Sequence, residues 1–181
     1  DTGPVYVSTH IRIEPDSRAE DLEQQIAQQG AKDLIAVLDQ FYAAHQGKAK
    51  PPEPIRQDDA QATYAPKLGP QDRTIDWGKS AEVLSRQIRA LGERLPVRAQ
   101  INGSGIQLLN ATWIEQSPLI DERLAAGTIV DASKSGILVQ CATDLLQITS
   151  LKVEGGKGSV LDPAGAINGF GHLFRIGARL V

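Results

Sequence analysis

Three short apolar segments between Gly127 and Lys157 constrain the fold of this chain more than any other feature of its sequence. Each segment is rich in Ile, Val, Leu and Thr, and turn residues separate it from the next, which is typical of short β-strands. The last segment carries apolar residues on both of its alternating faces, as in a small closed or nearly closed barrel. The three predicted strands are Thr128–Val130, Ile137–Cys141 and Leu145–Val153.

Two more predicted strands, Val97–Asn102 and Gln107–Glu115, precede this stretch. The sequence Asn102-Gly103-Ser104-Gly105 joins them and favours a hairpin turn, because Asn and Gly tolerate positive φ. Five short strands predict a mainly β C-terminal domain, and we expect a five-stranded Greek-key barrel of the OB type.

A helix that packs on this barrel is predicted upstream of the strands, where apolar residues recur at helical spacing. Asp76 or Ser80 would cap its N-terminus. Arg86 and Arg89 lie away from the apolar stripe, and two roles stay open for them: ion pairs with acids four residues away, or contact with a ligand. The apolar residues are Ala81, Leu84, Ile88 and Leu91, and the two acids are Glu82 and Glu93.

The first 47 residues have the pattern of the end of an α/β domain. Alternation from Val5 to Ile13 predicts a strand with one buried face. The sequence Ser17-Arg18-Ala19-Glu20 predicts a capping box, and Gly30 is expected to divide the region that follows into two helices. One strand and two helices cannot bury a core, so we expect the sheet of this domain to lie upstream.

A linker is predicted over residues 48–67, because Pro51, Pro52 and Pro54 lie together among polar residues without periodicity. The expected domains are therefore 1–47, the linker, and 68–181. The chain begins at Asp1 and contains no methionine, so we expect it to be part of a longer protein.

The charge of the chain is unevenly distributed. Residues 1–67 hold 7 Lys and Arg against 11 Asp and Glu, a net charge of −4, and residues 68–181 hold the remaining 12 against 11, a net charge of +1. This balance excludes the strongly basic domain typical of a free-standing nucleic-acid binder. It leaves room for a local basic face.

The sequence contains a single cysteine, Cys141, within a predicted strand, which predicts a buried apolar side chain rather than a reactive thiol. The absence of a disulfide framework fits a reducing, cytoplasmic compartment. His10, His45 and His172 have no partners at metal-ligand spacing, so we predict no metal site. No apolar run is long enough for a membrane span, and we predict no membrane contact.

Several short motifs follow one another in an order that resembles the methionyl-tRNA formyltransferase family. Two stretches, Leu91–Pro96 and Asn168–His172, depart from that pattern, because the family usually has an aromatic residue with Pro-x-Pro at the first and a more basic sequence at the second. The resemblance rests on Asp1–Pro4, Thr63–Lys67, Ile75–Trp77, Ile88–Ala90, Gly127–Ile129, Gly136–Ile137, Leu146, Gly156–Lys157 and Phe174–Leu180.

The resemblance implies a Rossmann-like formyltransferase domain, joined by a linker to an OB-type barrel that helps to bind tRNA. Such enzymes transfer a formyl group from 10-formyltetrahydrofolate to the amino group of initiator methionyl-tRNA. The family uses an Asn, a His and an Asp for catalysis. The Asn and His would lie upstream, and the Asp matches Asp1, which taken alone reads equally as an ordinary turn residue.

A barrel that holds tRNA would present cations to its phosphates. The candidate residues for this contact are Lys67, Arg98, Lys134, Lys152, Lys157 and Arg175, each of which also reads as a solubilising surface charge. We expect a monomer, and no formyl transfer by these 181 residues alone. The alternatives are an amino-sugar formyltransferase, a folate-hydrolysing relative, and a non-catalytic barrel-shaped binding module.

Overall fold

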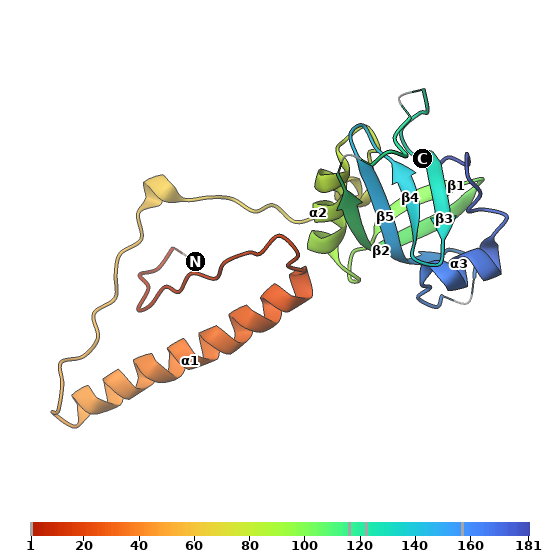
Figure 1. Cartoon of the computed structure of the whole chain (residues 1–181). Coiled ribbons are helices and arrows are strands. Elements are labelled where there is room, and N and C mark those ends of the chain that lie inside the picture. The colour runs from red at the N-terminus through yellow and green to blue at the C-terminus, as the bar shows by residue number, and fades with distance from the viewer. Residues whose placement is uncertain (1, 116, 122, 157) are drawn as a thin grey trace. The chain divides into compact units, whose positions relative to one another are not determined.

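The computed structural model describes residues 2–115, 117–121, 123–156 and 158–181 (Figure 1). The chain divides into two compact units, Asp1–Lys67 and Leu68–Val181. Within the described residues, no helix combines the length and apolarity needed to cross a lipid bilayer.

One long helix, α1 (Ala19–His45), dominates the first unit. Gly30 lies inside it, so the prediction of two helices is wrong; strong helix formers on both sides outweigh the cost of one glycine. The capping box is also wrong. Arg18 is the N-cap residue and makes no side-chain cap, while the hydroxyl of Ser17 accepts a hydrogen bond from the Glu14 amide at 2.9 Å.

The strand expected from Val5 to Ile13 is not formed. A single bridge joins Val5 to Ile55, with N–O distances of 2.9 and 2.7 Å, and the segment otherwise runs without strand pairing. Alternation produces a strand only where a neighbouring strand can accept and donate its backbone hydrogen bonds. Among the described residues of the first unit only Ile55 offers such a partner, and it pairs with Val5 alone, so the strand does not form. The short 3-10 helix η1 (Asp59–Gln61) follows in the segment toward the second unit.

The first unit has no buried core. None of the described residues 2–67 is buried, although the ring of Tyr6 meets that of Phe41 edge-on at 5.4 Å. Helix α1 therefore keeps most of its large apolar side chains exposed within this unit. The most exposed of them are Ile26, Leu34, Ile35, Leu38 and Tyr42.

The second unit is built on one antiparallel sheet with the strand order β1-β2-β5-β4-β3. All five predicted strands are confirmed, with shifts of a few residues at their ends. Asn102 and Gly103 form the predicted turn between the first two strands, both with positive φ. The strands are β1 (Val97–Ile101), β2 (Ser104–Ile114), β3 (Ile129–Ser133), β4 (Gly136–Gln140) and β5 (Leu145–Val153).

The strands do not close into the expected barrel, because the sheet order ends at β1 and at β3. The C-terminal segment, Ala178–Val181, hydrogen-bonds to both of these edges. Val181 exchanges two backbone hydrogen bonds with Gln100 of β1, at 2.7 and 2.8 Å, and the carbonyl of Ala178 accepts one from the amide of Ile129 in β3, at 2.8 Å. The chain terminus thus satisfies edge groups that a closed barrel would pair strand to strand.

Three shorter helices accompany the sheet. The 3-10 helix η2 (Pro70–Arg73) leads into α2 (Ala81–Leu91), which packs against β2 and β5, and α3 (Pro163–Phe170) lies against β3, β4 and β5. The predicted stripe of α2 is buried, as expected, and Ser80 caps the helix by accepting from the Val83 amide at 3.3 Å. Apolar side chains from the helices and the inner face of the sheet form one core.

Gly127 holds the junction between the C-terminal segment and the start of β3. Its φ is +90°, and its carbonyl accepts a hydrogen bond from the Leu180 amide at 2.8 Å. A Cβ here would collide with the Leu180 carbonyl oxygen and would press on the Trp77 ring, 3.2 Å away. Glycine is therefore required at this position for both its conformation and its size.

Replacing Gly127 with alanine should lower the free energy of unfolding by about 2–3 kcal/mol, from left-handed strain and a disrupted hydrogen bond. Urea denaturation followed by tryptophan fluorescence measures this loss. Gly155→Ala is the matched control, because Gly155 has a φ of +83° but open space around it. The control should lose only about 1–2 kcal/mol; equal losses for both variants would contradict the packing argument.

Candidate nucleic-acid interface

Two of the predicted site residues, Asp1 and Lys157, lie outside the described residues. The structure therefore bears on the other five candidates, all of which are basic. It brings two of them together on the sheet and leaves three at separate places.

Arg98 and Lys152 lie in one row across three strands. Arg98 of β1 pairs with Gln107 of β2, and Gln107 pairs with Lys152 of β5. Paired residues point to the same face of an antiparallel sheet. The flanking residues on each strand are buried, so this row projects from the outer face, away from the core.

One carboxylate, that of Glu154, contacts this row. Its Oε1 lies 3.5 Å from Nε of Arg98 and accepts a hydrogen bond from Nε2 of Gln107 at 3.3 Å. The ion pair is open to solvent, with 55% of the Arg98 side chain and 40% of the Glu154 side chain exposed. Screening by water makes such pairs weak.

The three strands that carry the row contain no Asp or Glu anywhere between their ends. Their outward positions carry amides and hydroxyls instead. Among these, Asn110 donates to the Thr149 hydroxyl at 3.0 Å and the Thr112 hydroxyl donates to Gln147 at 3.3 Å. Cations, amides and hydroxyls are the groups from which proteins make phosphate contacts.

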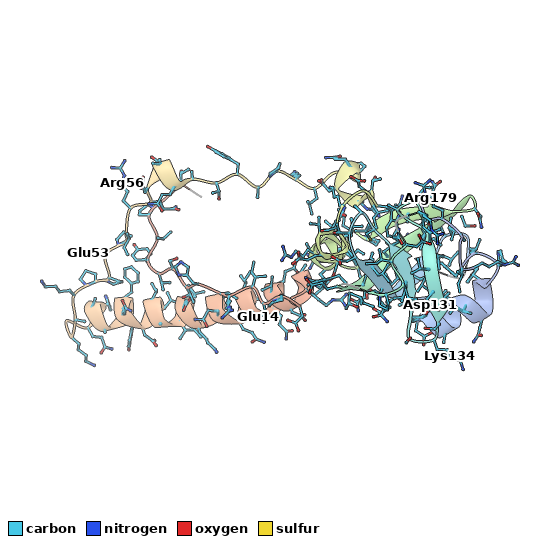
Figure 2. The ribbon with its side chains drawn as sticks, turned by 45° about the horizontal axis from the view of Figure 1, so that its top comes forward. Glu14, Glu53, Arg56, Asp131, Lys134 and Arg179 are labelled. Carbon is cyan, nitrogen blue, oxygen red and sulfur yellow. The ribbon has the colours of Figure 1, made fainter. Side chains whose placement is uncertain are left out.

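The remaining basic candidates lie elsewhere. Lys67 is an exposed residue at the end of the first unit. Lys134 lies at the turn between β3 and β4 (Figure 2), and Arg175 is exposed in the segment after α3. None of these three shares a strand with Arg98 or Lys152, so the structure does not join them to the row.

The two arginines of α2 have partners on their own helix. Nη2 of Arg86 lies 2.6 Å from Oε1 of Glu82, so Arg86 forms the ion pair that was one of the two roles left open for it. Arg89 donates to the hydroxyl of Ser85 at 2.6 Å. That buried hydroxyl in turn donates to the carbonyl of Ala111 in β2, so these groups help to fix the helix on the sheet.

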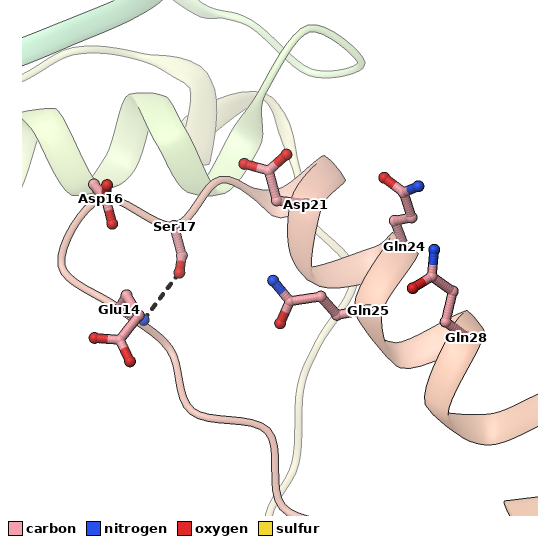
Figure 3. Close-up of a pocket in the computed structure, with 7 residues that line it drawn as sticks. All are labelled: Glu14, Asp16, Ser17, Asp21, Gln24, Gln25 and Gln28. Atoms are coloured by element: carbon pink, nitrogen blue, oxygen red, sulfur yellow. Dashed lines mark hydrogen bonds between the residues drawn. The ribbon is translucent and has the colours of Figure 1, made fainter. Parts of the chain in front are cut away.

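The first unit contains a polar hollow of about 480 Å³ beside the start of α1 (Figure 3). Its walls carry three carboxylates, and the other lining side chains are neutral. A concentration of negative charge repels anionic ligands such as phosphates or carboxylates. The lining residues are Glu14, Asp16, Ser17, Asp21, Gln24, Gln25 and Gln28.

The second unit contains two smaller hollows. One, of about 310 Å³, is mostly apolar and lies between the end of β5 and α3, with Phe170 as its one aromatic side chain. The other, of about 320 Å³, lies between η2 and α2 and combines Val83 and Leu91 with Lys79 and Gln87. Among the described residues, no three His, Cys, Asp or Glu side chains are placed to hold a metal ion.

Sequence reasoning found the two cations of the row but missed Gln107 and Glu154. Gln107 stands between buried Ile106 and Leu108, and this alternation marks it as outward-facing. Glu154 follows the last residue of β5, and only the pairing register brings it to Arg98. Register depends on contacts between distant segments, so no local pattern signals this meeting.

The second unit matches a family model described as "Formyl transferase, C-terminal domain" over residues 67–170, more than half of the chain. The chain belongs to the formyl transferase C-terminal domain family. Its resemblance to formyltransferases, first noted from short motifs, is thereby confirmed.

Curated relatives of this family member are named methionyl-tRNA formyltransferase. The protein of Burkholderia vietnamiensis is 33% identical over 157 residues, which cover 87% of this chain and 45% of that protein. The protein of Dictyoglomus turgidum is 34% identical over 158 residues, which cover 87% of this chain and 48% of that protein. The chain thus spans about half the length of these relatives.

Among solved structures, this formyl transferase family chain is similar to HypX from Aquifex aeolicus. A variant of HypX superposes with a TM-score of 0.68 at 15% identity, covering 92% of this chain and 28% of HypX. A crystal structure of HypX in complex with tetrahydrofolic acid gives a TM-score of 0.63 at 15% identity, covering 93% and 28%. At this level of identity the likeness shows a shared fold.

Cys141 takes no part in the row. It is buried, and burial raises the pKa of its thiol to about 12. Because the raised pKa keeps the thiol protonated near neutrality, we predict that iodoacetamide at pH 8 alkylates the native chain at least ~100-fold more slowly than the urea-unfolded chain. Mass spectrometry of timed samples measures both rates. Comparable rates would contradict the buried, neutral thiol.

Proposed function

We propose that this chain is the C-terminal part of an enzyme that transfers a formyl group from 10-formyltetrahydrofolate to the amino group of initiator methionyl-tRNA. The observation that carries the proposal is the family match over residues 67–170. It is supported by relatives named methionyl-tRNA formyltransferase that are 33% and 34% identical over 87% of the chain. Such an enzyme acts in the cytoplasm, where a free, reduced thiol is normal.

In this proposal the second unit holds the tRNA and does not carry out the chemistry. Its net charge of +1 is too small to attract tRNA through a strong overall field, so tRNA binding (the tRNA grip) depends on a local arrangement of cations. The row of Arg98, Gln107 and Lys152 supplies such an arrangement without an acid in its strands. Lys67, Lys134, Lys157 and Arg175 would add further phosphate contacts.

We further infer that residues 1–47 are the end of a Rossmann-like catalytic domain and that residues 48–67 are a linker. The lack of any buried residue among the described residues of the first unit supports this division, because α1 needs a partner surface for its apolar side chains. The relatives, about twice as long as this chain, contain enough additional sequence to supply that surface.

Formyl transfer requires that the amine nitrogen bond to the formyl carbon while the bond from that carbon to the folate nitrogen breaks. One proton passes from the amine to the departing nitrogen. We propose that the carboxylate of Asp1 orients the group that moves this proton, as the family resemblance implies. An Asn and a His of the catalytic domain would stabilise the oxyanion that forms at the formyl oxygen.

We propose that the folate binds outside the hollow beside α1, in the part of the catalytic domain that the additional length of the relatives supplies. Folates carry carboxylates on their glutamate tail, and the hollow is lined by the carboxylates of Glu14, Asp16 and Asp21. Repulsion between the folate carboxylates and the carboxylates that line the hollow would disfavour binding. The hollow therefore does not fit the co-substrate.

We predict that the 181-residue chain binds initiator tRNA with an affinity that falls as salt rises, because phosphate contacts release counterions. Two or more contacts should give a log–log slope of about −1.5 or steeper. Fluorescence anisotropy of labelled initiator tRNA at several salt concentrations measures this slope. Absence of binding at low salt, or a slope near zero, would contradict the proposed grip and favour an acceptor other than tRNA.

A further inference from the structure

We propose that Glu154 occupies the phosphate position on Arg98 in the free protein and gives way to an RNA phosphate when tRNA binds. The inference rests on the proposed function, because it names the residues of the tRNA grip and the group that restrains it. Glu154 is thus assigned as a residue that tunes RNA affinity through competition for a single guanidinium group.

The sheet places the competing groups in register. Arg98, Gln107 and Lys152 stand opposite one another on β1, β2 and β5, and Glu154 comes two residues after Lys152. The amide of Glu154 donates to the carbonyl of Gly105 at 2.8 Å, which extends the pairing of β2 beyond the last residue of β5. Glu154 therefore lies beside the row as a fixed part of the backbone pairing.

Gly105 leaves the space that the carboxylate of Glu154 fills. A Cβ at residue 105 would collide with Oε2 of Glu154. The other carboxylate oxygen, Oε1, faces the row, where it meets Nε of Arg98 at 3.5 Å and Nε2 of Gln107 at 3.3 Å. One carboxylate oxygen thus contacts two members of the row, as a phosphate oxygen could.

The exchange of carboxylate for phosphate is favourable on chemical grounds. The ion pair is about half exposed on both sides, and such pairs hold weakly in water. A phosphate can offer Arg98 two oxygens for a bidentate contact, whereas Glu154 meets Arg98 through Nε at 3.5 Å. Once displaced, the Glu154 carboxylate remains solvated and loses little.

The position of Glu154 also explains why it would matter more than other acids. The strands β1, β2 and β5 contain no Asp or Glu. Among the described residues, Glu154 is the acid whose carboxylate contacts the row, at Arg98 and Gln107. When RNA binds, its charge faces the incoming phosphates and repels them. Neutralising it would remove both the competitor for Arg98 and this repulsion.

The test compares Glu154→Gln with Glu82→Gln in the 181-residue chain. Both changes remove one negative charge from a half-exposed ion pair with arginine, with carboxylate exposures of 40% and 41%. Only Glu154 contacts the row; Glu82 lies on α2 with Arg86. Circular dichroism melts of each variant confirm that the fold is kept.

Glu154→Gln should tighten initiator tRNA binding about five-fold at low salt and steepen the log–log salt slope by up to about 1. Glu82→Gln should change the affinity less than two-fold. Arg98→Ala should weaken binding and make the slope shallower by about 1, and in that background the gain from Glu154→Gln should shrink to less than half.

The outcomes separate this inference from the proposed function. If the unaltered chain binds tRNA with a clear salt slope but the two glutamine variants behave alike, the role of Glu154 is wrong and the tRNA grip stands. An undiminished gain from Glu154→Gln in the Arg98→Ala background would also overturn the competition. If the unaltered chain does not bind tRNA, the grip and the inference fail together.

Discussion

Backbone hydrogen bonds from the last four residues to both edges of the sheet are the constraint on which the second unit depends. Val181 pairs with Gln100 on β1, while Ala178 and Leu180 bond to Ile129 and Gly127 at the start of β3. Without these bonds, two strand edges would expose unpaired amides and carbonyls, which favours association with other chains. The C-terminal segment therefore pairs with both sheet edges in place of direct pairing between β1 and β3. Gly127 permits this because a Cβ at that position would collide with the Leu180 carbonyl oxygen.

This closure also holds in place the strand that carries one end of the row that we propose binds RNA. The bonds to Val181 lie on Gln100, two residues from Arg98, and the carbonyl of Arg98 accepts a hydrogen bond from the Ile75 amide at 3.2 Å. The edge strand that carries the outermost cation is thus held by β2 along one side and by Val181 and Ile75 along the other. The first unit is the opposite case, because none of its described residues is buried and most large apolar side chains of its helix stay exposed within the unit. The second unit is built around a buried core, and the described residues of the first unit are not.

Much of the second unit could be predicted from the sequence. The strands and α2 follow from alternation, helical spacing and the Asn102-Gly103 turn, all of which are local signals. The open sheet and the pairing of Arg98 with Glu154 could not be predicted, because both depend on register between distant segments. The wrong predictions for Val5–Ile13 and Gly30 share a cause: whether alternation forms a strand, and whether a glycine interrupts a helix, depends on contacts and neighbouring sequence that no single local signal specifies.

Amide hydrogen exchange of the C-terminal segment tests the central claim most directly. If the terminus closes the sheet, the amides of Leu180 and Val181 should exchange as slowly as those of the central strand β5, because they open only with the whole unit. Their protection should fall together with that of Gln100 and Ile129 as denaturant is added. Fast exchange at Leu180 and Val181, with β5 still protected, would show a frayed terminus and contradict the account.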